Sequence, residues 1–273
     1  MYVLTREQKI EIPFNSTYIE ISYRYEQRNV ETLFFIHGLG CTKDSFDGIW
    51  KDRKFDHHSI FTLDLPGFGN SLRPKQFSYK MEDQAEICRL LIEHFRLHNV
   101  NLIGHSMGGA ISLLLINKIP DTVISFVNLE GNLIGEDCTI SRKATKYSLN
   151  EFEVTFDDFR SKLQETNKLS RAKHELKFYY ELLSRCDPFV FRKSSESLVK
   201  WSDSGKLLDM FLGMKTKNWY VYGEWNKNLP SIKLLKSKGV QLVEVPKSGH
   251  FMMIGNPEGF NQMLLRLLTR KNV

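Results

Sequence analysis

Short apolar runs alternate with longer segments of helical periodicity along most of the chain. Residues 17–25 alternate apolar and polar side chains with period two, as a half-exposed strand does. Residues 32–37 and 59–65 are almost wholly apolar, which is typical of strands covered on both faces. Residues 81–95 place their apolar side chains on one face of a helix. This alternation predicts an α/β domain with a largely parallel sheet.

The same pattern continues beyond residue 98, with one interruption. We expect strands over 99–104, 123–129, 219–222 and 240–245, a helix over 106–118, and a last helix that begins at 256–257. Residues 136–217 are rich in charged and aromatic side chains at helical spacing and contain no run typical of a strand. Because strand patterns resume afterwards, we interpret this segment as a helical insertion rather than a separate domain.

Composition excludes several classes of protein. Of the 273 residues, 41% are hydrophobic and 26% are charged, a mixture typical of a soluble globular protein and not of a fibrous or disordered one. The net charge is +6, but Lys and Arg are interspersed among 32 acidic residues, so we expect no nucleic-acid partner. The longest apolar stretch, 110–116, is too short for a membrane span.

Neither targeting nor a bound metal is expected. Charged residues at positions 6, 7 and 9 interrupt any apolar signal region, so we expect a cytoplasmic protein. The four cysteines lie far apart and form no zinc-binding spacing. We therefore expect no metal and no cofactor.

The strongest chemical motif is Gly-His-Ser-Met-Gly at residues 104–108, between a predicted buried strand and a predicted helix. A G-x-S-x-G at such a junction is typical of a sharp turn that exposes a nucleophilic serine, here Ser106. The turn also places the serine oxygen at a helix N-terminus, where partial positive charge stabilises an anion.

Three more motifs follow predicted strands. They are HGLG at 37–40, DLPGFGNS at 64–71 and SGHF at 248–251. In this order, and with the serine turn, they resemble the α/β-hydrolase family over nearly the whole chain. The resemblance implies a mostly parallel central sheet flanked by helices, with a helical cap inserted after the sixth strand. Residues 1–135 and 218–273 would form the core, and 136–217 the cap.

By the same resemblance, Ser106 would be the nucleophile and His250 the general base of a catalytic triad. The backbone N–H groups of Leu39 and Met107 would form the oxyanion hole. His37 would be structural.

The third triad member departs from the family pattern. Asn226 stands where most members place an aspartate after the seventh strand. Some relatives take the acid from the end of the sixth strand, where this chain has Glu130. Glu224, two residues before Asn226, is an alternative, and a site without an acid is a third. We favour Glu130 and leave the other two open.

The resemblance implies a serine hydrolase of the carboxylesterase or lipase kind, acting on a small-molecule ester or related acyl substrate. Two alternatives remain at this point. One is a non-catalytic small-molecule receptor on the same fold, which the asparagine at position 226 suggests. The other is a carbon–carbon bond hydrolase, although residues 41–43 replace the Gly-Pro-Gly usual in that group.

Overall fold

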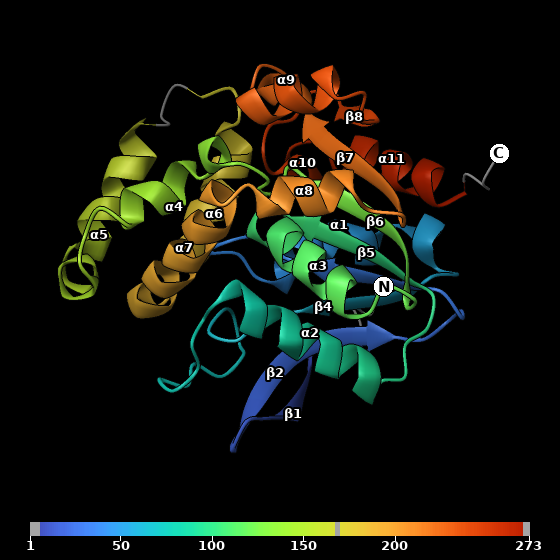
Figure 1. The fold of residues 1–273 in the computed structure, drawn as a ribbon, viewed down its shortest axis with the longest axis horizontal. Helices are drawn as coiled ribbons and strands as arrows, with labels where there is room; N and C mark the ends of the chain where they lie inside the picture. Colours follow the sequence, from blue (N-terminus) through green and yellow to red (C-terminus); the bar gives the residue numbers. More distant parts are fainter. Residues whose placement is uncertain (1–5, 167–169, 270–273) are drawn as a thin grey trace.

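The computed structural model describes residues 6–166 and 170–269, and its centre is an eight-stranded sheet (Figure 1). The strand order is β1-β2-β4-β3-β5-β6-β7-β8, antiparallel where β2 pairs with β1 and β4, and parallel elsewhere. The predicted, mostly parallel sheet is therefore confirmed. The strands are β1 (Gln8–Phe14), β2 (Thr17–Glu26), β3 (Thr32–Ile36), β4 (Ser59–Leu63), β5 (Val100–His105), β6 (Val123–Leu129), β7 (Lys217–Gly223) and β8 (Leu242–Val245).

Helices cover both faces of this sheet. In Figure 1, α2 and α3 lie in front of the strands, and α1 and α11 lie behind them. Every residue of β3, β4 and β5 is buried, which explains why most of their side chains are apolar. The flanking helices are α1 (Asp47–Lys51), α2 (Met81–His94), α3 (Met107–Lys118), α9 (Pro230–Ser237), α10 (Met252–Gly255) and α11 (Pro257–Thr269), with short 3-10 helices η1 (Lys43–Phe46), η2 (Arg53–Phe55) and η4 (Glu224–Asn226).

Strand β1 was not predicted. Its apolar residues alternate, but Pro13 and two charged residues, Lys9 and Glu11, weaken the strand pattern. The strand is possible because β1 lies at the edge of the sheet and pairs only with β2. There a proline need not donate to a neighbour.

Between β6 and β7 the chain forms helices over the described part of 135–212. In Figure 1, α4, α5, α6 and α7 gather beside the sheet, whereas α8 lies in front of it next to α3. Phe211 of α8 packs against Phe126 and Tyr220 of the sheet. The last helix therefore belongs to the layer that covers the strands. The segment consists of η3 (Gly135–Asp137), α4 (Thr139–Ala144), α5 (Leu149–Thr166), α6 (Lys173–Leu183), α7 (Pro188–Asp203) and α8 (Lys206–Leu212).

Candidate active site

Ser106 occupies a strained turn between β5 and α3. Its φ of 53° and ψ of −120° lie outside the regions that ordinary residues populate, and it is the N-cap of α3. Two backbone hydrogen bonds hold the turn: the Ser106 N–H donates to Leu129 O at 3.0 Å, and the Gly109 N–H donates to Ser106 O at 2.8 Å. The serine is thus fixed at the carboxyl end of a central strand, where ligands bind in open α/β sheets.

The glycines on either side of the serine are required by close packing. A Cβ on Gly104 would overlap with Ser112 Oγ, and a Cβ on Gly108 would overlap with the carbonyl of Ile36 in the adjacent strand β3. The G-x-S-x-G pattern therefore follows from how tightly the turn packs onto the sheet.

Glu130 leaves the end of β6 and is almost completely buried, with 5% of its surface exposed. Its two carboxylate oxygens accept three hydrogen bonds. Oε1 accepts from the Gly223 N–H at 2.8 Å, and Oε2 accepts from Asn226 Nδ2 at 2.8 Å. The third bond joins Oε2 to His250 Nδ1, also at 2.8 Å. Three donors compensate a buried carboxylate well.

Neither Asn226 nor the other acid candidate, Glu224, bonds to the imidazole. Asn226 donates its side-chain amide to Glu130 and does not take the acid's place beside the imidazole. Glu224 instead accepts a hydrogen bond from the Lys247 backbone N–H at 2.8 Å. Of the candidate acids, the structure brings Glu130 to His250.

The surroundings of His250 favour its charged form. Burial alone would lower the pKa of His250, but the hydrogen bond and the negative charge of Glu130 more than offset burial, so the pKa lies above its ordinary value. The charges of Glu175 and Asp137 act in the same direction. Because a carboxylate only accepts, Nδ1 carries a proton, and the neutral ring keeps its lone pair on Nε2.

Ser106 and His250 line one cavity of about 330 Å³ at the carboxyl edge of the sheet. No hydrogen bond joins the two side chains in the described structure; such bonds are often long before substrate binds. Loops of the sheet supply Gly38, Leu39 and Glu130, whereas the inserted helices contribute Ile140, Tyr179 and Leu198. The lining of this cavity contains no Lys or Arg.

The two predicted oxyanion donors come from the start of α3 and from the loop after β3. Met107 is the first residue of α3, and the first N–H groups of a helix have no partner inside it. Leu39 lies in the loop after β3 and lines the cavity. Their role as oxyanion donors stays a prediction.

A family model described as the alpha/beta hydrolase fold matches residues 31–237, which is well over half of the chain. The chain belongs to the α/β hydrolase family.

Curated relatives match a shorter stretch. The chain is 35% identical over 97 residues to the uncharacterized hydrolase YugF of Bacillus subtilis, covering 36% of this chain and 35% of that protein. It is 31% identical over 114 residues to a putative esterase/lipase of Haemophilus influenzae, covering 40% and 39%. The chain thus spans between a third and two fifths of the length of these relatives.

Solved structures resemble the whole fold. An esterase from Exiguobacterium antarcticum superposes with a TM-score of 0.76 over 96% of this chain and 100% of that one, at 15% sequence identity. At so low an identity, the likeness concerns the fold.

Two further histidines of this α/β hydrolase support the loops around the cavity. His37 Nδ1 donates to Gly38 O at 2.8 Å, and its Nε2 accepts from the Leu65 N–H at 3.0 Å. Burial lowers the pKa of His37 to about 4, so it stays neutral at physiological pH. Burial, aided by the charge of His250, likewise holds the pKa of His105 well below its usual value. His105 Nε2 donates to the His250 carbonyl at 2.9 Å.

A buried ion pair that was not predicted from the sequence joins the loops after β3 and β4. Lys43 Nζ donates to Asp64 Oδ2 at 2.7 Å, and neither side chain exposes more than 1% of its surface. Asp64 also accepts from the backbone N–H groups of Lys43, at 2.7 Å, and Asn70, at 2.9 Å. Asp64 is therefore a turn-forming residue. Lysine alone in a sequence gives no sign of burial.

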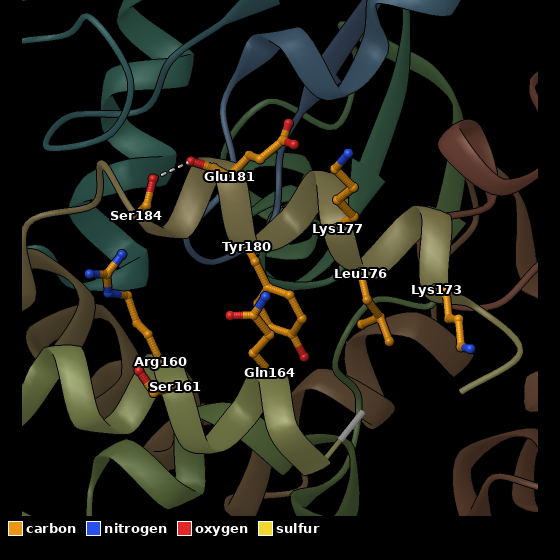
Figure 2. A pocket seen from close by; sticks show the side chains of 9 residues that line it. All are labelled: Arg160, Ser161, Gln164, Lys173, Leu176, Lys177, Tyr180, Glu181 and Ser184. Carbon is orange, nitrogen blue, oxygen red and sulfur yellow. Dashed lines mark hydrogen bonds between the residues drawn. The ribbon is translucent and has the colours of Figure 1, made fainter. Parts of the chain in front are cut away.

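A second cavity, of about 500 Å³, lies between α5 and α6 and is separate from Ser106 (Figure 2). Tyr180 of α6 reaches across it and donates its hydroxyl to Leu163 O at 2.8 Å. Its other lining residues include Arg160, Lys173 and Lys177, so its character is more basic than that of the cavity at Ser106.

Residues 6–166 and 170–269 contain neither a cluster of metal-binding side chains nor a helix that could cross a membrane. No three His, Cys, Asp or Glu side chains in these ranges gather closely enough to hold a metal ion. None of the helices there combines the length and the apolar character that a bilayer crossing demands.

Proposed function

We propose that this α/β hydrolase cleaves a small carboxylic ester through an acyl-enzyme on Ser106. The observation that carries the proposal is the 2.8 Å hydrogen bond from His250 Nδ1 to Glu130 Oε2, in the cavity that Ser106 also lines. A nucleophile, a base and a buried acid that follow β5, β8 and β6 form the arrangement that acyl transfer needs.

In the first half-reaction, Ser106 Oγ attacks the ester carbonyl carbon while His250 Nε2 takes the hydroxyl proton. Glu130 holds the imidazole in orientation and stabilises the positive charge that it gains. The N–H groups of Leu39 and Met107 donate to the oxygen that becomes negative. His250 then returns its proton to the departing alcohol oxygen, and the acyl group stays on Ser106.

In the second half-reaction, water takes the place of the alcohol. His250 Nε2 accepts a proton from the water, and the hydroxide attacks the acyl carbon. The tetrahedral intermediate collapses as the proton returns to Ser106 Oγ, releasing a carboxylic acid. All of these proton transfers use side chains of this chain.

The shape and charge of the cavity suggest the substrate class. About 330 Å³ lies at the lower end of the range for small-molecule sites. Glu136 and Asp137 are among the lining residues, and no Lys or Arg is, which disfavours a negatively charged substrate. A neutral ester with a short acyl chain fits best, and helices of 136–217 would act as its cap.

A fluorophosphonate probe tests the proposal. The intact protein should gain one adduct, located at Ser106 by peptide mass spectrometry, and should hydrolyse p-nitrophenyl butyrate. Ser106→Ala should form no adduct and lose several orders of magnitude in kcat/KM, with an unchanged circular dichroism spectrum. If the wild-type protein gains no adduct, or if Ser106→Ala keeps more than a tenth of the kcat/KM, Ser106 is not an activated nucleophile.

A further inference from the structure

One carboxylate from the inserted helices reaches the loop that carries His250. Glu175 of α6 exposes 1% of its surface. Its Oε1 accepts from the Gly249 N–H at 2.7 Å, and its Oε2 accepts from the Phe251 N–H at 3.0 Å. The two bonds therefore hold the backbone on either side of His250.

Other contacts show that this loop and α6 fit closely together. Tyr179, one turn along α6, stacks on Phe251 with ring centroids 5.0 Å apart. A Cβ on Gly255 of α10 would overlap with the Glu175 carboxylate, so the chain leaves only the room that this side chain needs. The position of the carboxylate is thus determined from several sides.

We propose that Glu175 is a positioning residue, through which the inserted helix α6 fixes the direction of the His250 imidazole. This inference rests on the proposed function, since it takes His250 to be the base. Burying a carboxylate carries a large desolvation penalty. Here the hydrogen bonds from two backbone N–H groups, one on each side of His250, offset that penalty. The helices between β6 and β7 would accordingly complete the active site as well as cover it.

Charge gives Glu175 an effect that packing alone would not produce. Burial raises the pKa of Glu175, while the Gly249 and Phe251 N–H groups and the nearby His250 lower it in part. The neighbouring Glu130 raises it further. Four titratable residues surround His250. They are Glu175, Glu130, Asp137 and the neutral His105. Removing the charge of Glu175 should lower the pKa of His250.

Glu175→Gln is the principal test. Glutamine offers one acceptor and one NH₂ group, so one of the two backbone N–H groups loses its partner and faces a donor. We expect kcat for p-nitrophenyl butyrate to fall by about 10- to 100-fold, with KM changed less than about threefold, because misplacement acts on the reacting groups. In a plot of kcat/KM against pH, the rise on the acidic side (the acidic limb) should move to lower pH, because the pKa of His250 falls.

Glu175→Asp separates the effect of the carboxylate's position from the effect of its charge. It is also the test variant if Glu175→Gln does not fold. Aspartate keeps the charge but is one methylene too short to reach both N–H groups. It should lower kcat and leave the acidic limb close to that of the wild type. Glu181→Gln is the matched control, because Glu181 is an exposed residue of the same helix (Figure 2). It should change neither kcat nor the pH profile.

Fluorophosphonate labelling distinguishes failure of this inference from failure of the proposed function. Wild-type protein that is not labelled at Ser106 would overturn the function and the inference together. Normal labelling of the wild type, combined with wild-type kcat in Glu175→Gln, or in Glu175→Asp if the former is unfolded, would overturn the role of Glu175 alone. A fall in kcat with no shift of the acidic limb in a folded Glu175→Gln would also contradict it.

Discussion

At the scale of single residues, the most informative feature is how completely Glu130 is bonded. Its carboxylate accepts from a backbone N–H, an amide and an imidazole, and its φ of 42° is unusual for a residue with a side chain. The amide of Asn226 therefore supports the acid. In the proposed mechanism, this glutamate at the end of β6 takes the role of the aspartate expected after β7.

The raised pKa of His250 predicts the pH dependence of catalysis. His250 must be neutral to accept the proton of Ser106, so kcat/KM should rise with pH and reach its plateau above the folded pKa. Because Glu130 raises that pKa, we expect the midpoint of the acidic limb to lie above about 6.5, the ordinary value of histidine. The measurement is kcat/KM for p-nitrophenyl butyrate between pH 5 and 9. A midpoint clearly below the ordinary value would contradict this description of the site.

At the scale of elements, the turn between β5 and α3 depends on how closely its glycines approach β3. Gly108→Ala would bring a Cβ into the carbonyl of Ile36, which is backbone and cannot move aside cheaply. We expect unfolding free energy to fall by roughly 1–3 kcal/mol and labelling of Ser106 to slow, since the turn itself must shift. Thermal denaturation and the labelling rate measure the two effects.

Gly48→Ala is the control for that substitution. Gly48 lies in α1, where an added Cβ meets only ordinary contacts at 3.8 Å or more, and alanine favours a helix. Gly48→Ala should have a free energy of unfolding equal to or slightly above that of the wild type, and its Ser106 should be labelled at the wild-type rate. Equal stability of the two variants would show that the turn tolerates a side chain at Gly108.

Much of the fold could be predicted from the sequence because strands buried on both faces leave apolar runs. The G-x-S-x-G motif likewise has a local cause in the turn at Ser106. Two features could not be predicted. In strand β1, at the sheet edge, a proline and two charged residues interrupt the apolar pattern, and Glu175 contacts residues more than 70 positions away. A charged residue on a helix gives no local sign of such a partner.

At the scale of the whole molecule, the cavity lies between the sheet and the inserted helices, so both determine which substrates fit. Apolar side chains of the insertion, Ile140 and Leu198, face a volume of about 330 Å³. A short acyl chain can be enclosed there. A long one would have to separate the helices from the sheet or remain in water.

This enclosure predicts a preference for short acyl chains. With the leaving group held constant, kcat/KM for p-nitrophenyl butyrate should exceed that for the palmitate by at least about tenfold. Leu198→Ala should reduce the difference by enlarging the cavity, whereas Val154→Ala, at a position 85% exposed on α5, should not. Equal rates for the two esters would contradict an enclosed site.

The role of Glu130 is the central claim, and kcat in a series of variants at Glu130 and Asn226 tests it most directly. Glu130→Gln should lower kcat by about 10²–10⁴, because the imidazolium formed during attack loses its charged partner. Asn226 Nδ2 lies 2.8 Å from the oxygen that His250 binds, so an added Asn226→Asp should place a carboxylate near the same nitrogen and restore part of the rate. Glu224→Gln should change kcat less than about tenfold, since Glu224 bonds to the backbone of Lys247. A mild effect of Glu130→Gln together with a severe effect of Glu224→Gln would contradict the account.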